Sequence, residues 1–265
     1  MSQAPSPDRA DPDQLARDLQ PVAAWLVVLD FDGTLAPIVD HPDLAQPAPG
    51  ALDAIAALMA RTPVAVVSGR PIADVRRRLK DLPLSYAGGH GTELELSDGT
   101  AAPLIDPGTV LATLDAVEAE LEALVGSEPG WLLERKQASL AVHHRLATPE
   151  DVSALLPRVE ALLERRRTDP PGFEVLHGKA VAELRPTGAD KGAALRRIHA
   201  ATPTLRPLMV GDDVTDEDAF VVARELGGQG ILVSEGPRPS AADLRLNDPA
   251  EVVRFLAALL GRPTG

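Results

Sequence analysis

Residues 25–34 have the sequence WLVVLDFDGT, an apolar run that ends in an acidic turn. The run is short and contains adjacent valines, as expected of a strand buried on both faces of a parallel sheet. Asp30 and Asp32 follow the apolar run directly, and Gly33 allows the backbone to turn tightly after them. Ligands bind at the carboxyl ends of strands in open α/β sheets, so this stretch predicts a site of chemistry.

The same alternation of strands and helices extends along the chain on both sides of a central segment. Before it we expect a helix, a strand, a helix and a strand at residues 48–60, 63–67, 71–80 and 84–87. After Pro186 we expect a helix, two strands and a helix at residues 190–200, 208–210, 230–233 and 251–260. This alternation predicts an α/β fold with a doubly wound, mostly parallel, Rossmann-like sheet joined by right-handed crossovers.

The central segment has a different pattern. A charged helix at 108–125 is followed by alternating segments at 131–136 and 139–145, which predict a hairpin turning at Gln137 and Ala138. A helix at 149–167 and strands at 173–176 and 180–184 complete what we interpret as an inserted α+β cap. The expected organisation is a flexible tail, disordered over residues 1–12, with a lead-in helix (1–20), the first half of a core domain (21–105), the cap (106–185) and the second core half (186–265).

The composition is that of an ordinary globular protein, with 265 residues, 45% apolar and 25% charged. A formal charge of −13 argues against a nucleic-acid partner, because binding to phosphates needs a basic surface. The chain has no cysteine, which excludes thiolate chemistry and is compatible with the cytoplasm. No signal-peptide core or membrane-spanning apolar stretch is present, so we expect a cytoplasmic monomer without a membrane partner.

Further polar residues follow other predicted strands. Asp212 and Asp213 come after the strand at 208–210, and an all-oxygen, cysteine-free site suits Mg²⁺. A carboxylate nucleophile attacking a phosphate ester needs such a metal and a cationic side chain to offset charge repulsion. Lys191, at a predicted helix N-terminus, is the candidate cation, and the Ser68 hydroxyl can bind a phosphoryl oxygen.

Each of these residues also has an ordinary structural interpretation. An Asp-x-Asp after a strand is often a turn or a helix cap. Lys191 alone reads as a solvated surface residue, and the acidic run after Gly211 reads as a helix start with favourable charges. Their order, and their shared location at strand ends, favour one common site.

These residues resemble the four motifs of the haloacid dehalogenase-like phosphatase superfamily, in the same order. The motifs are residues 30–35 (DFDGTL), 68–70 (SGR), Lys191 and 211–216 (GDDVTD). The resemblance implies Asp30 as the nucleophile and Asp32 as the general acid and then base, with Ser68 and Lys191 binding phosphate. It further implies that Mg²⁺ is held by Asp30, by Asp212 and by the backbone carbonyl of Asp32. Thr34, Asp213 and Asp216 would support these motifs. An aspartate at position 32 indicates a phosphatase rather than a transporting ATPase, because the leaving alkoxide needs a proton.

Within that superfamily, residues 26–233 resemble the trehalose-6-phosphate phosphatase family. The match is carried by residues 89–93 (GHGTE), 134–136 (ERK), 139–145 (SLAVHHR), 183–186 (ELRP) and 211–217 (GDDVTDE). One departure is His144, where the family usually has Tyr. The resemblance implies substrate-binding roles for Gly69, Arg70, His90, Glu93, Glu134, Lys136, His143, Arg145 and Glu183. Glu134 and Lys136 lie two apart on a predicted strand, which is equally typical of an exposed ion-pair ladder.

The resemblance implies hydrolysis of trehalose 6-phosphate to trehalose and phosphate, the last step of trehalose biosynthesis. One alternative is a phosphatase of the same superfamily that acts on another sugar phosphate, such as sucrose phosphate or a mannosyl phosphoglycerate. A second alternative is a phospho-accepting receiver module, which binds partners rather than a substrate. Such a module needs neither an inserted cap nor a proton donor at Asp32, and fold analogy alone does not decide function.

Overall fold

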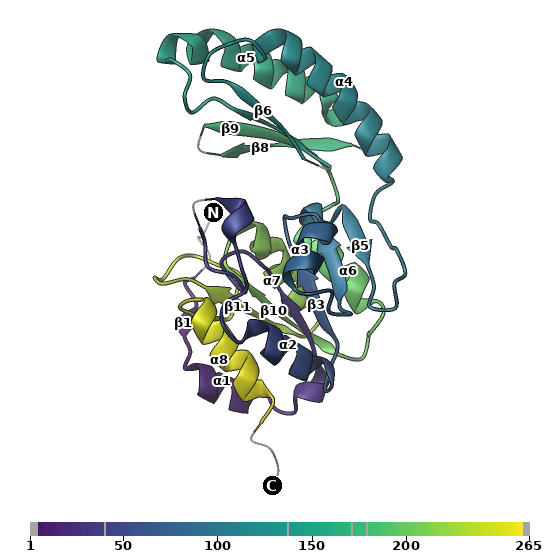
Figure 1. Cartoon of the computed structure of the whole chain (residues 1–265), viewed down its shortest axis with the longest axis vertical. Coiled ribbons are helices and arrows are strands. Elements are labelled where there is room, and N and C mark those ends of the chain that lie inside the picture. Colours follow the sequence, from purple (N-terminus) through teal and green to yellow (C-terminus); the bar gives the residue numbers. More distant parts are fainter. Residues whose placement is uncertain (1–4, 40, 137, 171, 179, 262–265) are drawn as a thin grey trace. The chain divides into compact units, whose positions relative to one another are not determined.

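The computed structural model describes residues 5–39, 41–136, 138–170, 172–178 and 180–261, apart from the side chains of His90 and Pro107. The chain divides into two compact units, which can be followed in Figure 1. Unit 1 comprises Met1–Leu104 and Asp190–Gly265, and unit 2 comprises Ile105–Ala189. Along the part of the chain that the structure describes, no helix is both long and apolar enough to cross a membrane.

Unit 1 is built on one sheet with the strand order β1-β12-β11-β10-β2-β3-β4-β5. Every neighbouring pair is parallel except β4 and β5, which are antiparallel. The strands are β1 (Asp8–Arg9), β2 (Trp25–Leu29), β3 (Val64–Val67), β4 (Ser85–Gly88), β5 (Glu93–Glu95), β10 (Arg206–Gly211), β11 (Gln229–Val233) and β12 (Leu244–Leu246). The predicted mostly parallel sheet is confirmed.

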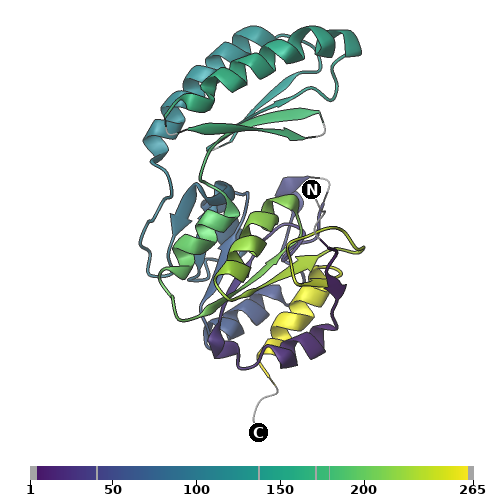
Figure 2. The ribbon, with the colours of Figure 1, turned by 180° about the vertical axis from the view of Figure 1, so that it is seen from behind.

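Helices cover both faces of this sheet, as Figures 1 and 2 show. Side chains of β2 alternate between two cores: Val27 and Leu29 pack with α2 and α8, whereas Leu26 and Val28 pack with α6 and α7. The helices are α1 (Pro12–Asp18), α2 (Ala51–Met59), α3 (Ile72–Arg78), α6 (Lys191–His199), α7 (Glu217–Glu225) and α8 (Pro249–Leu259). Burial on both faces explains the unbroken apolar run of β2.

The N-terminal region differs from the expected disordered tail over residues 8–12. Asp8 and Arg9 form β1, which pairs in parallel with β12 at the edge of the sheet. Asp11 then caps α1, accepting hydrogen bonds from the backbone of Asp13 and Gln14. The expectation was wrong here because backbone pairing orders β1. Polar composition gives no sign of such pairing.

Unit 2 is an antiparallel sheet with the strand order β6-β7-β9-β8, and two long helices pack on one of its faces (Figure 2). Its core joins Leu114 and Leu121 of one helix and Val159 of the other to Leu140 and Leu184 of the sheet. The elements are α4 (Pro107–Val125), β6 (Leu132–Arg135), β7 (Leu140–His143), α5 (Pro149–Arg165), β8 (Phe173–Gly178) and β9 (Val181–Pro186). Gln137, expected in the β6–β7 turn, lies outside the described residues.

Short 3₁₀ helices occupy several connections of both units. They are η1 (Val22–Ala24), η2 (Pro42–Leu44), η3 (Gly89–Gly91), η4 (Arg166–Thr168) and η5 (Val214–Asp216). Two of them bear on the site below, because η2 lies in the loop that follows β2, and η5 is separated from β10 only by Asp212 and Asp213.

Candidate active site

Three neighbouring strands of unit 1 end in polar side chains at one edge of the sheet. Asp30 follows β2, Ser68 follows β3 and Asp212 follows β10, and these strands lie side by side in the order β10-β2-β3. A pocket of about 290 Å³ lies at these strand ends, lined by Asp30, Asp32, Ile38, Ser68, Gly69, Lys191, Asp212, Asp213 and Thr215. The strand-end placement expected from the sequence therefore brings these groups into one pocket.

Lys191 lies inside this site as the first residue of α6. Its Nζ donates to Oδ1 of Asp30 at 2.8 Å and to Oδ1 of Asp216 at 2.7 Å. The Lys191 side chain is 3% exposed, so the reading of this residue as a solvated surface lysine is wrong. Burial alone would lower the pKa of Lys191, but the charges of Asp30 and Asp216 outweigh it and hold that pKa above its ordinary value.

Asp216 fixes the acidic loop that follows β10. Its Oδ2 accepts hydrogen bonds from the backbone N–H groups of Asp212 and Asp213, each at 3.0 Å. A Cβ on Gly211 would lie 2.4 Å from the Asp216 carboxyl carbon, so only glycine fits there. With its other oxygen on Lys191, the fully buried Asp216 connects the loop to the cation.

Carboxylate oxygens of Asp30 and Asp212 lie within 4.8 Å of each other. Burial raises the pKa of Asp30 well above its ordinary value, although the charge of Lys191 opposes this. Burial, followed by the charge of Asp216, raises the pKa of Asp212 to about 6. Oδ1 of Asp212 is buried and has no hydrogen-bond partner among the described residues.

These carboxylates fit a divalent cation. Oxygens of Asp30, Asp212 and Asp216 all lie within 4.8 Å of one another. Gly33 (φ +74°) approaches the site so closely that a Cβ there would lie 2.0 Å from Oδ2 of Asp212. An unpartnered, buried carboxylate oxygen close to other carboxylate oxygens is the kind of ligand that a hard cation such as Mg²⁺ prefers.

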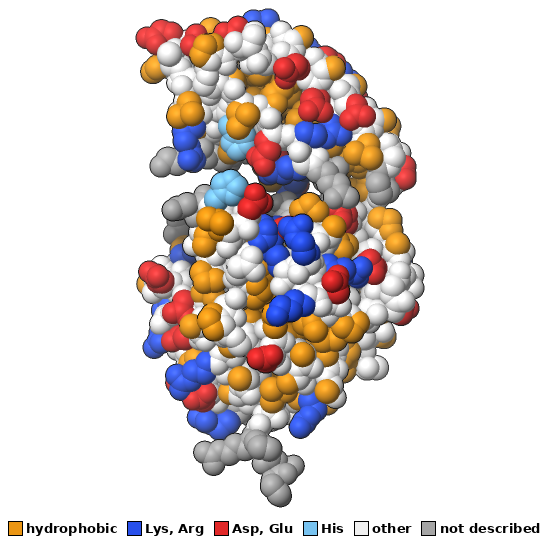
Figure 3. All heavy atoms as spheres, in the orientation of Figure 1, with side chains coloured by type: hydrophobic (Ala, Val, Ile, Leu, Met, Phe, Trp, Pro, Cys, Tyr) orange, Lys and Arg blue, Asp and Glu red, His pale blue; other side chains and the backbone are white. Residues whose placement is uncertain are grey.

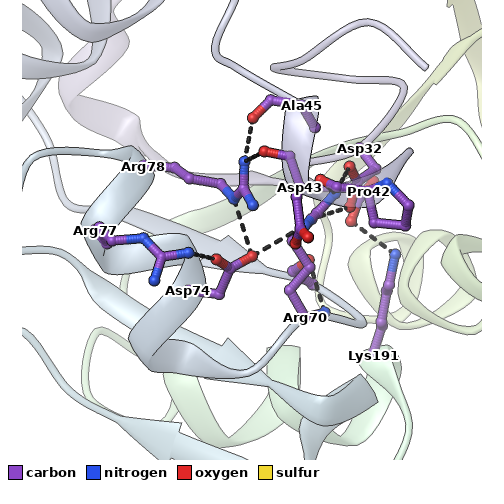
Figure 4. Close-up of polar contacts among 11 residues, drawn as sticks. Asp32, Pro42, Asp43, Ala45, Arg70, Asp74, Arg77, Arg78 and Lys191 are labelled. Atoms are coloured by element: carbon purple, nitrogen blue, oxygen red, sulfur yellow. Dashed lines mark hydrogen bonds and ion pairs between the residues drawn. The ribbon is translucent and has the colours of Figure 1, made fainter. Parts of the chain in front are cut away.

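Asp32 lies at the pocket wall with its carboxylate held by Arg70 (Figure 4). The guanidinium forms a fork: Nε donates to Oδ2 at 2.6 Å and Nη2 to Oδ1 at 2.7 Å. The backbone N–H of Arg70 donates to Oγ of Ser68 at 3.1 Å. The structure thus places Arg70, expected to bind substrate, in direct contact with the expected general acid.

Glu93 and His90, also expected to bind substrate, belong to unit 1. Oε2 of Glu93 accepts from the backbone N–H of Ile72 at 3.1 Å, at the start of α3, and burial raises the pKa of Glu93. Its Oε1 is buried and has no partner within the described part of the chain. The side chain of His90 lies outside the description.

Candidate sugar-binding residues of unit 2 share the sheet face opposite α4 and α5. Glu134 and Glu183 flank Ala141 in one row across β6, β7 and β9. The Nζ of Lys136 lies 3.1 Å from both oxygens of Glu183, and Oγ of Ser139 lies 2.5 Å from Oε1 of that carboxylate. This polar cluster was expected except for Ser139.

His143 ends β7, and His144 and Arg145 follow it. Nε2 of His143 lies 2.8 Å from Oε2 of Glu134, so His143 joins the same face. Arg145 lies in an exposed turn after β7. His144 packs against the Trp131 ring with centroids 5.5 Å apart, which gives the position that departs from the family pattern a role in packing.

Two residues near the pocket were missed by reasoning from motifs. Nη2 of Arg238 donates to the backbone carbonyl of Asp212 at 2.9 Å, and Nη1 lies 2.8 Å from Glu217. Asp74 accepts from Nη1 of Arg70 at 2.9 Å. The four-residue spacing of Arg70 and Asp74 could have signalled their contact. The sequence carries no comparable signal for Arg238.

The sheet, its strand order and the acidic strand ends define a haloacid dehalogenase-like hydrolase fold. A structure titled as a haloacid dehalogenase-like hydrolase from B. subtilis superimposes with a TM-score of 0.59 at 16% identity, over 87% of this chain and 98% of that one. The C-terminal domain of C. albicans trehalose-6-phosphate phosphatase gives a TM-score of 0.77 at 23% identity, over 98% and 99% of the two chains. These similarities establish the fold.

The chain belongs to the trehalose-phosphatase family, since the sequence profile of that family matches residues 28–250. The trehalose-phosphate phosphatase of Mycobacterium bovis is 39% identical over 240 residues. That match includes 86% of this chain and 59% of the mycobacterial protein, so the chain corresponds to a little over half of the relative's length. The family matched is the one that the sequence motifs predict.

Proposed function

We propose that the chain is a Mg²⁺-dependent phosphatase that hydrolyses trehalose 6-phosphate to trehalose and phosphate, the last step of trehalose biosynthesis. The observation that carries the proposal is the contact of Lys191 with Asp30 at 2.8 Å, beside the unpartnered oxygen of Asp212. A buried carboxylate next to a fixed ammonium and a cation site suits nucleophilic attack on a phosphate ester. The family membership and the mycobacterial relative support the choice of substrate.

In the proposed reaction, an oxygen of Asp30 attacks phosphorus while the bond from phosphorus to the sugar oxygen breaks. Asp32 takes up a proton on one carboxylate oxygen, which leaves its contact with Arg70, and gives that proton to the leaving oxygen. Water then attacks the aspartyl-phosphate, and Asp32 takes a proton from the water. Phosphate leaves and the Asp30 carboxylate is restored. Lys191, with the Ser68 hydroxyl at the pocket wall, stabilises the negative charge on the phosphoryl oxygens.

Mg²⁺ would be held by the carboxylates of Asp30 and Asp212 and the backbone carbonyl of Asp32. When bound, it neutralises phosphoryl charge, which lets an acidic pocket accept an anionic substrate. Asp216 has a different part in this arrangement, because its oxygens are engaged by Lys191 and the backbone of the loop. Asp216, together with Asp213, would orient Asp212 and Lys191.

Unit 2 is proposed to be an inserted cap that binds the sugar. Glu134, Lys136 and Glu183 present carboxylates and an ammonium on one sheet face, and a disaccharide offers many hydroxyl groups to such donors and acceptors. This cluster supports the choice of a disaccharide phosphate, rather than a small phosphate ester, as the substrate. Gly69, Arg70, His90, Glu93, His143 and Arg145 remain further candidates for substrate contact.

A substrate panel tests this proposal. Phosphate release is measured for trehalose 6-phosphate, sucrose phosphate and a mannosyl phosphoglycerate, with Mg²⁺ and with EDTA. We expect the highest kcat/KM on trehalose 6-phosphate and loss of turnover in EDTA. A higher kcat/KM on another sugar phosphate rejects the substrate, and full activity in EDTA rejects the metal requirement.

The proposal also includes a cytoplasmic enzyme that acts as a monomer on a small sugar phosphate. The absence of cysteine suits a reducing compartment. A formal charge of −13 disfavours nucleic acid as a partner. Light scattering of the purified protein checks the monomer, and a mass twice that of the chain contradicts it.

A further inference from the structure

Asp74 lies at the centre of a charged network in unit 1 that reaches the pocket. Its Oδ2 accepts from Nη1 of Arg70 and from Nε of Arg78, each at 2.9 Å, and its Oδ1 accepts from Arg77 (Figure 4). Lys and Arg side chains gather on the surface over α3 (Figure 3). One carboxylate therefore holds three guanidinium groups that would otherwise repel one another.

The network is partly buried, which favours a defined geometry. The side chains of Arg78, Arg70 and Asp74 are 4%, 13% and 18% exposed. Burial alone would raise the pKa of Asp74, but the hydrogen bonds from Arg78 and Arg70 outweigh it and lower that pKa, so the carboxylate stays charged. Arg70 and Asp74 lie four residues apart, as do Asp74 and Arg78, so the α3 region sets their spacing.

The same guanidinium groups fix the loop that follows β2. Nη2 of Arg70 donates to the carbonyl of Pro42 at 2.9 Å, and Nη1 of Arg78 donates to the carbonyls of Asp43 and Ala45. Asp74 thus stabilises both the side chain that grips Asp32 and the loop beside it.

Arg70 is the link between this network and the chemistry. Its fork holds both oxygens of the Asp32 carboxylate, at 2.6 and 2.7 Å, while its remaining nitrogen is held by Asp74. A guanidinium is planar, so fixing one edge on Asp74 fixes the direction of the opposite edge. The side chain of Asp32 is 36% exposed, and without such support it would be free to take other rotamers.

We propose that Asp74 is a positioning residue, which acts through Arg70: Arg70 keeps one oxygen of Asp32 while the other, once protonated, points at the leaving oxygen. The inference rests on the proposed function, because it takes Asp32 as the proton donor. Asp74 itself touches neither substrate nor metal in this scheme. Misplacing a catalytic group by about 1 Å costs up to about 100-fold in rate.

The test compares Asp74→Asn with wild type on trehalose 6-phosphate and on 4-nitrophenyl phosphate, whose leaving group needs little protonation. We expect kcat on the sugar phosphate to fall roughly 10- to 100-fold, with KM changed less than about 3-fold. The loss of kcat/KM on the aryl phosphate should be several-fold smaller, since kcat/KM reports the step in which the leaving group departs and not the later hydrolysis that both substrates share. Glu95→Gln is the matched control, because Glu95 pairs with Arg76 of the same helix at 2.7 Å without contacting Arg70. This control should behave as wild type.

Coupling is tested by adding Asp74→Asn to an Arg70→Lys variant, whose single ammonium cannot form the fork. If Asp74 acts through Arg70, the double variant loses no more activity than the worse single variant. Losses that multiply overturn the inference, as do an equal loss of kcat/KM on both substrates or an unchanged kcat. If Asp74→Asn does not fold, Asp74→Glu keeps the charge among the three arginines, and the same substrate comparison applies to it.

A crystal structure of the Asp74→Asn variant separates failure of this inference from failure of the proposed function. Displacement of the Arg70 fork from Asp32 supports the inference even if trehalose 6-phosphate is not the substrate. An unchanged fork overturns it whatever the activity. If wild type prefers another sugar phosphate, the proposed substrate falls, and the Asp74 comparison is made on that sugar phosphate instead.

Discussion

The ammonium nitrogen of Lys191 lies 2.8 Å from Oδ1 of Asp30, with the two side chains only 3% and 5% exposed. These residues are 161 positions apart in the chain, and the parallel sheet brings the helix start that carries Lys191 to the end of β2. The pair gives the proposed nucleophile a cationic neighbour within the core. Asp216, at 2.7 Å from the same nitrogen, extends the pair to the acidic loop.

Removing the cation should destabilise the protein. Lys191→Met leaves Asp30 and Asp216 buried without their partner, so we expect the free energy of unfolding to fall by about 3–5 kcal/mol. Denaturant unfolding measures this change. Arg196→Gln is the control on the same helix, because its pair with Glu225 is about half exposed and worth at most about 1 kcal/mol. Equal effects of the two substitutions would argue against a buried ion pair.

Metal binding should be visible without any assay of activity. Saturating Mg²⁺ should raise the Tm of the wild-type protein by several degrees, because a ligand at about 100 times its Kd adds about 2.7 kcal/mol of stability. Asp212→Asn should abolish this shift, since it replaces the buried carboxylate beside Asp30 with a neutral amide. Asp243→Asn, which breaks a partly exposed pair with Arg224 away from the pocket, should keep it. A Mg²⁺ shift that survives in Asp212→Asn contradicts the site.

Asp32→Asn should slow catalysis most for substrates whose leaving group needs a proton. We expect turnover of trehalose 6-phosphate to fall by about 10²–10⁴-fold, the usual contribution of general acid–base catalysis. The loss of kcat/KM on an aryl phosphate should be much smaller, because its leaving group departs without protonation and kcat/KM does not include the later hydrolysis of the aspartyl-phosphate, which both substrates share. Steady-state kinetics on both substrates measure the two values of kcat/KM. An equal loss of kcat/KM on both would remove Asp32 from the role of general acid.

The polar cluster of unit 2 should affect binding of the sugar rather than chemistry. Glu183→Gln should raise KM for trehalose 6-phosphate by roughly 10-fold, because hydrogen bonds to charged groups contribute about 1.5–3 kcal/mol. The KM for the aryl phosphate should not change. Glu118→Gln is the control, since its pair with Arg135 at 3.1 Å lies on the side of the sheet that faces α4. The cap assignment fails if Glu183→Gln has no effect on either substrate, or if Glu118→Gln has the same effect.

The parts of the fold that the sequence predicted well are those with strong side-chain patterns. The strand β2 is an example, because burial on both faces requires an unbroken apolar run. By contrast, β1 consists of Asp8 and Arg9 and is held by backbone pairing at the sheet edge. The short edge strand β5, which runs antiparallel, was missed for a similar reason. Backbone hydrogen bonds leave no periodic trace in short polar segments.

The sequence predicted which strand-end residues lie close together, but not the contacts between side chains. Strand-end motifs identified Asp30, Ser68 and Asp212 as neighbours, because parallel strands end at one edge of the sheet. They did not show that Arg70 turns toward Asp32. Side-chain direction depends on partners such as Asp74, which belongs to no motif and acts only through folded geometry.

The most direct test of the central claim is to identify the residue that carries phosphate during turnover. The enzyme is mixed with trehalose 6-phosphate and Mg²⁺, quenched, treated with borohydride to reduce an aspartyl-phosphate to homoserine, and analysed by peptide mass spectrometry. We predict homoserine at position 30 in the wild-type protein, and none in Asp30→Asn, which should fold but release no phosphate. Homoserine at another aspartate, or phosphate release by folded Asp30→Asn at the wild-type rate, would contradict Asp30 as the nucleophile.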